Sequence, residues 1–191
     1  MLAVRGKQMI EELGLRLGLT GTSQLLGSIE SLRGDESAAE REYREGYDLS
    51  VELGETGYLS TTACYLGEAA YAQGRYGEAL RLSEESEQAG ASDDVSTQIR
   101  WRALRAKVLA RQGQLEQAKQ LAHDAVQRSR RTDYIDETAQ TLSSLAEVLE
   151  LAGDLPDARS ALEEALQLYD QKGNVVSAGR TRERLTSLEA Q

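Results

Sequence analysis

Apolar residues recur along the chain at the spacing of amphipathic helices, three or four positions apart, and each such stretch ends near a glycine before another begins. Four glycine-centred segments superimpose, and their glycines are 40, 39 and 40 residues apart. The segments are Leu32–Ala39, Ala72–Ala79, Arg111–Ala118 and Leu151–Ala158. This regular spacing predicts an internal repeat of about 40 residues that occurs four times.

Each repeat is predicted to be a helix-turn-helix, because its glycine lies between two helical patterns. Glycine is favoured in the left-handed conformation that ends many helices. An alanine follows each glycine by five residues, and a small residue precedes it by seven, which predicts a close approach of the two helices. The glycines are Gly34, Gly74, Gly113 and Gly153, the alanines are Ala39, Ala79, Ala118 and Ala158, and the preceding small residues are Gly27, Gly67, Ala106 and Ala146.

The second helices carry further packing positions, and the second repeat differs from the others there because both positions are serine. The pairs are Tyr43 and Gly46, Ser83 and Ser86, Ala122 and Ala125, and Leu162 and Ala165. Helix starts are expected at residues whose side chains accept a hydrogen bond from an unpaired N–H group. These residues are Asp93 or Asp94, Asp133, Asp154 and Asn174. The whole pattern predicts an all-α chain of about ten helices.

Single helices are expected at both ends of the repeat array. The first spans about Leu2–Leu17 and looks like the second half of an interrupted repeat, whereas the last spans about Asn174–Glu189 and would cover the fourth repeat. This asymmetry favours a truncated N-terminus and a natural C-terminus. One domain over 1–191 is predicted, with a partial repeat at 1–18, repeats at 19–56, 57–92, 93–132 and 133–172, and a capping helix at 173–191.

The glycine and alanine positions resemble the tetratricopeptide repeat (TPR), although the period exceeds the family's usual length of about 34 residues. The resemblance implies a right-handed α-solenoid whose first helices line a concave groove. Three stretches also resemble the C-terminal repeat arrays of actinobacterial-type multidomain regulators, which join a nucleotide cyclase or other output domain to a P-loop ATPase. These stretches are Leu53–Thr61, Asp93–Arg102 and Leu168–Ala178. The sequence has neither the phosphate-binding motif GxxxxGK[ST] nor a cyclase-like metal-binding segment, so neither activity is carried over.

Composition and charge argue against several classes of function. A formal net charge of -10 argues against binding to nucleic acid, whose phosphates are held by Lys and Arg. The sequence has no apolar run of roughly 20 residues and no signal-peptide pattern, so we expect a cytoplasmic protein. With one cysteine, Cys64, and one histidine, His123, it offers no metal-ligand spacing and no activated nucleophile. A non-catalytic protein without cofactor or metal is predicted.

Candidate ligand-binding residues follow from the register of the resemblance, which places them on the groove side of the first helices. They are Gln24, Ser28, Thr61, Cys64, Glu68, Tyr71, Arg100, Ala103, Lys107, Arg111, Gln140, Ser143 and Glu147. Arg100, Lys107 and Arg111 share one helix face within about 40°. An acidic peptide would bind this basic stripe through charge-assisted hydrogen bonds. Alternatively, the stripe forms an internal ion-pair ladder with Glu68 and Glu147.

Aromatic residues near the groove allow two interpretations. Tyr58, Tyr65 and Trp101 are expected to pack in the core, with partner recognition as the alternative.

The predicted function is a protein-interaction or autoregulatory module of a bacterial signalling protein, which binds a peptide or a partner domain in the groove. The partner would be a separate protein or the ATPase or output region of the chain's own parent. One alternative is a homo-oligomeric scaffold, a homodimer for example, that pairs through Met9, Ile10, Leu13 and Leu17. Another is a receptor for a small molecule or a signalling peptide.

Overall fold

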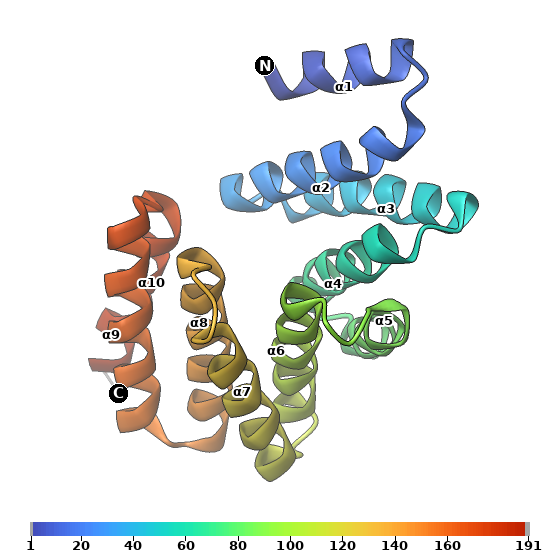
Figure 1. The fold of residues 1–191 in the computed structure, drawn as a ribbon. Coiled ribbons are helices and arrows are strands. Elements are labelled where there is room, and N and C mark those ends of the chain that lie inside the picture. The colour runs from blue at the N-terminus through green and yellow to red at the C-terminus, as the bar shows by residue number, and fades with distance from the viewer. Residues whose placement is uncertain (1, 190–191) are drawn as a thin grey trace. The chain divides into compact units, whose positions relative to one another are not determined.

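The computed structural model describes residues 2–189 of the chain, and within this range it is helical with no strand. The helices are α1 (Leu2–Glu12), α2 (Arg16–Arg33), α3 (Glu36–Leu53), α4 (Thr56–Ala72), α5 (Tyr76–Ala89), α6 (Val95–Arg111), α7 (Leu115–Ser129), α8 (Ile135–Ala152), α9 (Leu155–Lys172) and α10 (Val175–Glu189). The predicted all-α class and the expectation of about ten helices are therefore confirmed (Figure 1).

The chain divides into two compact units at the first turn of α6. Unit 1 extends to Thr97 and contains α1 to α5, and unit 2 begins at Gln98 and contains most of α6 together with α7 to α10. In unit 1, each helix from α1 to α5 packs against the next one along the chain. In unit 2 the same holds from α7 to α10.

Small residues set the approach of the two helices within each repeat, as the sequence predicts. The four alanines that follow the turn glycines, Ala39, Ala79, Ala118 and Ala158, are completely buried. The ring of Tyr43 on α3 lies directly over Gly27 on α2, so that a Cβ atom at Gly27 would come within 2.3 Å of the ring. The turn glycines Gly34, Gly74, Gly113 and Gly153 all have positive φ, between 76° and 84°. Glycine at these positions avoids the steric cost of a side chain.

The two units fill their interiors with different chemistry. Unit 1 buries eight hydroxyl residues completely, and most of them hydrogen-bond to a carbonyl of their own helix. The eight are Thr20, Ser23, Ser50, Ser60, Thr62, Ser83, Ser86 and Thr97. The two serines of the second repeat are thus accommodated, because Ser83 donates to the Leu80 carbonyl and Ser86 lies 3.0 Å from the Cys64 sulfur. Unit 2 instead has a continuous core of alanine, leucine and valine with Tyr169.

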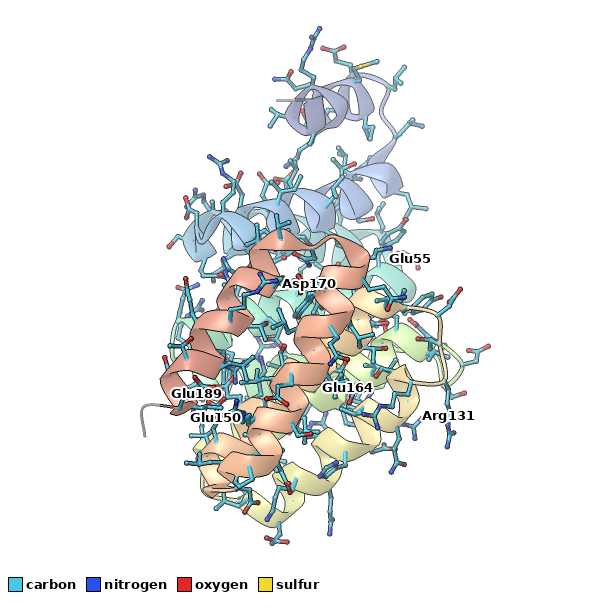
Figure 2. All side chains as sticks on the ribbon, turned by 90° about the vertical axis from the view of Figure 1, so that its left-hand side faces the viewer. Glu55, Arg131, Glu150, Glu164, Asp170 and Glu189 are labelled. Atoms are coloured by element: carbon cyan, nitrogen blue, oxygen red, sulfur yellow. The ribbon has the colours of Figure 1, made fainter. Side chains whose placement is uncertain are left out.

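Helix α10 is attached to unit 2 by packing and by ion pairs, as expected for a terminal cap. Leu185 and Leu188 pack against the apolar core. Arg184 of α10 contacts Glu150 of α8 at 2.8 Å, and Arg182 contacts Asp170 of α9 at 2.7 Å. Glu150 and Asp170 are labelled in Figure 2.

The predicted helix over Leu2–Leu17 is wrong in its C-terminal part. Helix α1 ends at Glu12, because Gly14 adopts a φ of 68° and the Leu15 N–H group bonds back to the Ile10 carbonyl. This arrangement closes a helix C-terminus. A second helix then starts at Arg16, which is before the predicted start of the first repeat at residue 19.

Two of the predicted helix starts are capped as expected. The Asp94 side chain accepts from the Thr97 N–H group at 3.1 Å, and the Asn174 side chain accepts from Ser177 at the same distance. Asp154 lies at the start of α9, but its side chain does not cap the helix and contacts Lys119 instead. Asp133 was predicted to cap α8, but Tyr134 occupies the cap position. Asp133 therefore lies one residue before the cap.

A closed group of four charges joins α3 to the start of α5. Glu40 accepts hydrogen bonds from Arg75 at 2.6 Å and from Arg44 at 3.5 Å, and Glu78 contacts both arginines. Gln73 also donates to Glu40 at 2.8 Å. Burial by itself raises the pKa of the Glu40 carboxyl, but the hydrogen bonds from Gln73 and Arg75 and the charge of Arg75 outweigh it. The pKa of Glu40 therefore lies below its ordinary value.

We predict that the contribution of Glu40 to stability depends on pH. A depressed folded-state pKa stabilises the fold above the ordinary pKa of 4.5, and this stabilisation is lost as the pH falls through the folded-state value. Glu40→Gln should therefore lower the urea midpoint at pH 7, and its difference from the wild type should shrink by pH 3. Glu84→Gln, on the exposed side of α5, is the matched control and should show no such convergence. A constant difference for Glu40→Gln would contradict the prediction.

We also predict that Gly27→Ala destabilises the chain by about 1–3 kcal/mol, because the added methyl group overpacks the contact with Tyr43. Gly179→Ala in α10 is the control. A Cβ atom there meets nothing within 4 Å. Because alanine has the higher helix propensity, Gly179→Ala should stabilise the chain by about 0.5–1 kcal/mol. Urea unfolding followed by far-ultraviolet circular dichroism measures both. Equal effects of the two substitutions would show that the close approach at Gly27 is not a packing constraint.

Candidate functional site

The predicted binding residues lie on the first helix of each repeat, which is α2 or α4 in unit 1 and α6 or α8 in unit 2. We call the partly exposed polar side of these helices the first-helix face.

In unit 1, the candidate polar groups form hydrogen bonds with other residues of the unit. Gln24 of α2 donates to the Thr62 hydroxyl of α4 at 2.7 Å and so connects two first helices. Ser28 donates to the Gln24 carbonyl and accepts from the Tyr43 hydroxyl at 3.3 Å. Thr61 lies 3.2 Å from the Thr97 hydroxyl. These contacts order the face of unit 1 and leave its side chains only partly exposed.

Several predicted positions are buried. Tyr71 is 8% exposed and its ring contacts Tyr76 of α5. Cys64, Ala103 and Lys107 are buried as well, so their side chains contribute little surface. Glu68 is half-buried in unit 1.

In unit 2, charged residues of α6 pair with carboxylates of α8. Arg100 contacts Glu137 at 2.8 Å, and Arg111 contacts Glu147 at 2.7 Å. The Glu137 side chain is only 7% exposed, whereas Arg111 is 38% exposed and Glu147 21%. Arg100 and Arg111 therefore form ion pairs between helices, as in the alternative interpretation of the basic stripe. Glu147 is one of the two partners which that interpretation named. Glu137 was missed, because its position on the α6 side of α8 depends on how the two helices pack.

Three of the candidates share one side of α8. Gln140, Ser143 and Glu147 are spaced by three and four residues, so they form a stripe about 10 Å long. Gln140 is exposed and donates to Asp136 at 3.2 Å, and Ser143 and Glu147 are partly exposed. With Arg111 on the adjacent α6, this stripe is the partly exposed polar part of the first-helix face in unit 2.

The stripe is supported from behind by α9 and α10. The carbonyl of Ser143 accepts from Arg184 of α10 at 3.2 Å, and the Ser143 side chain interacts with the buried Tyr169 of α9. Burial raises the pKa of Tyr169 to about 12, so its phenol stays protonated at neutral pH. Fixed supporting contacts of this kind hold a binding surface in one geometry.

The aromatic candidates have different environments. Trp101 is buried, as expected for a core residue, and the guanidinium groups of Arg102 and Arg105 lie 4.0 and 4.3 Å from its ring. Tyr65 stacks on Tyr43 at a centroid distance of 5.2 Å. Tyr58 differs from the core expectation, since 37% of it is exposed.

The two residues considered for chemistry, Cys64 and His123, have different surroundings. Cys64 is buried beside Ser86, and His123 lies exposed on α7, at an open depression of about 550 Å³ that also includes Lys119 and Asp154. Within residues 2–189, no three His, Cys, Asp or Glu side chains are grouped for metal binding. The helices of that range are also too short or too polar to cross a membrane.

Asp124, next to His123, forms a second charge cluster that sequence analysis did not identify. It accepts from Arg102 of α6 at 2.7 Å and from Arg128 of α7 at 3.0 Å. Burial raises the pKa of the Asp124 carboxyl, but the hydrogen bonds from Arg128 and Arg102 prevail and lower the pKa. The cluster joins α6 to α7, so it contributes to helix packing.

Comparison with known proteins supports a repeat architecture. Residues 99–171 and residues 61–85 match models of the tetratricopeptide repeat, and together the two matches cover about half of the chain. The search of curated proteins gave no match.

Solved structures with a similar fold include BtubC and two Rap proteins. BtubC (BKLC) from P. vanneervenii has a TM-score of 0.63 at 17% identity, over 98% of this chain and 88% of BtubC. A Rap protein complexed with Competence and Sporulation Factor has a TM-score of 0.68 at 11% identity over 90% of this chain. RapI in its apo form has a TM-score of 0.57 at 13% identity over 97% of this chain. The chain spans about half the length of the two Rap proteins.

We predict unequal roles for the two ion pairs between α6 and α8. Glu137→Ala should destabilise the chain by about 3 kcal/mol, because it removes the enclosed carboxylate that Arg100 contacts. Glu147→Ala, the same substitution on the same helix, should cost only about 0–1 kcal/mol because its pair with Arg111 is partly solvated. Chemical denaturation measures both. A larger loss for Glu147→Ala would reverse the assignment.

Proposed function

Because the chain is a tetratricopeptide-repeat protein, we propose that it is a non-catalytic protein-interaction module that binds an extended segment of a partner on the first-helix face. The observation that carries the proposal is the stripe Gln140, Ser143 and Glu147 on α8, with Arg111 of α6 beside it. Tetratricopeptide repeats are typically non-catalytic.

The pair of Arg111 and Glu147 allows a ligand to bind at small cost. A partly exposed ion pair contributes only about 0–1 kcal/mol, so a carboxylate of the partner can replace Glu147 on the Arg111 guanidinium without a large loss. Arginine binds carboxylates through two parallel hydrogen bonds, which also fixes their orientation. The displaced Glu147 carboxylate is then available to accept hydrogen bonds from the partner's backbone or from a basic side chain.

The buried pair of Arg100 and Glu137 has a different role in this proposal. Glu137 is enclosed, and replacing it by a ligand would require the helices to separate. The pair therefore holds α6 against α8 and keeps Arg111 beside the stripe. Arg100 and Lys107 act as structural residues in this scheme, although both belong to the predicted basic stripe. Gln140 supplies an exposed amide that can donate to and accept from a peptide backbone.

The partner suggested by this chemistry is a segment that presents an acidic side chain to Arg111 and an extended backbone to Gln140. It belongs to another protein or to the parent of this chain, and an autoregulatory role in signalling corresponds to the second case. Binding would regulate only if the partner had different affinities for two states of the module.

A receptor for a signalling factor is the second candidate. It is favoured by the similarity in fold to the Rap protein that is complexed with Competence and Sporulation Factor. A receptor would show a rise in melting temperature on addition of its ligand.

The proposal is tested with a displayed library of random 12-residue peptides selected on the folded chain. We expect enriched peptides to contain Asp or Glu, and their dissociation constants, measured by fluorescence anisotropy, to rise at least about tenfold for Arg111→Glu. The matched control is Arg131→Glu, in the exposed turn between α7 and α8 (Figure 2). This variant should bind the enriched peptides with the dissociation constants of the wild type.

Three results would count against the first-helix face as the binding site. They are a selection without enrichment, enriched peptides that bind Arg111→Glu as tightly as the wild type, and equal losses for Arg111→Glu and Arg131→Glu. Gln140→Ala adds a test of the α8 stripe that does not change charge, and it should weaken the same peptides.

A further inference from the structure

Exposed apolar side chains are concentrated at the start of the chain. Between residues 4 and 17, five large apolar residues are each between 45% and 69% exposed, whereas unit 2 shows no such concentration within its described part. The five are Val4, Met9, Leu13, Leu15 and Leu17. Clusters of exposed apolar residues commonly mark an interaction surface.

The orientation of α1 is fixed by contacts on its inner side. The Lys7 ammonium group donates to Glu42 at 2.9 Å and to Glu45 at 2.7 Å, both on α3. Ile10 packs against Gly18 of α2. Ile10 therefore faces inward, in contrast to the expectation that it belongs to an oligomerisation face, whereas Met9 remains exposed.

Opposite Lys7, α1 presents Arg5, Met9 and Glu12 to solvent. At 100° per residue these three lie roughly 140–200° around the helix from Lys7, at the spacing i, i+4 and i+7. All three are exposed, and within residues 2–189 neither Arg5 nor Glu12 forms an ion pair. We call this stripe, with the adjoining Leu13, the outer face of α1.

We propose that the outer face of α1 binds a second copy of this chain, with the two α1 helices antiparallel about a two-fold axis. The charges are arranged for self-pairing, because the basic residue is near the start of the helix and the acidic residue is at its end. An axis through the midpoint between Gln8 and Met9 places Arg5 of each copy beside Glu12 of the other, with the two Met9 side chains in contact at the centre. Such isologous pairing uses one patch twice.

A head-to-tail arrangement of copies fits less well. It would oppose Met9 and Leu13 of the outer face to the exposed side of α10, which carries Arg182, Glu183, Thr186 and Ser187. Two-fold pairing instead brings apolar side chains together and joins each positive charge to a negative one. Leu15 and Leu17 are also exposed, in the residues that follow α1, and they would add apolar area that the short helix alone does not provide.

The test is sedimentation equilibrium of the 191-residue chain in four forms, which are the wild type, Arg5→Glu, Glu12→Arg and the double variant. The wild type should show twice the chain mass of 20.9 kDa. Each single variant places two like-charge contacts in the interface, and we expect its dimer dissociation constant to rise at least about tenfold. The double variant restores opposite charges and should return close to the wild-type value.

Arg131→Glu is the control for a change of net charge, since it makes the same substitution at an exposed position of unit 2. Circular dichroism spectra of all variants verify that α1 and the rest of the chain remain folded. The proposal is overturned by a wild type that stays monomeric up to about millimolar concentration. A dimer that tolerates both single variants, or a double variant as weak as the single ones, overturns it as well.

Discussion

The fold depends on the close approach of the two helices in each repeat. This approach requires a small residue on the first helix and an alanine on the second, because a larger side chain would separate the backbones. Gly27 under the Tyr43 ring is the tightest example, and the completely buried alanines, such as Ala79 and Ala158, give the same contact in other repeats. Since the second helix must turn back immediately, a glycine with positive φ follows the first helix.

The two units satisfy this constraint with different interiors. Unit 1 buries hydroxyl groups that bond to carbonyls of their own helices, so its packing is close but its apolar content is low. Unit 2 gains more from the hydrophobic effect, because alanine, leucine and valine form one continuous cluster. Charged residues reinforce unit 1 from outside, through the Glu40 cluster and through Lys7 on α1. Stability and interaction surface are therefore distributed differently in the two halves.

Ion pairs between neighbouring first helices serve two purposes, and burial distinguishes them. The Glu137 carboxylate of the pair with Arg100 is enclosed, and this pair acts in packing, whereas the pair of Arg111 and Glu147 is more exposed. In the proposed binding mode, one helix therefore carries a fixed structural contact and a contact that a ligand replaces. The outer face of α1 follows a different principle, because Arg5 and Glu12 are too far apart to pair within one helix and, in the proposed dimer, pair with those of the second copy.

The sequence by itself determined the helical class, the period of the repeats and the positions of the turn glycines and buried alanines. These follow from local spacing, since a glycine or alanine at a fixed offset constrains the backbone wherever it occurs. It did not determine the end of α1 at Glu12, the partner of Arg100 or the burial of Lys107 and Tyr71. Those features depend on which side of one helix meets the next. Only the tertiary structure decides them, because the helical period fixes which residues share a face but not what that face contacts.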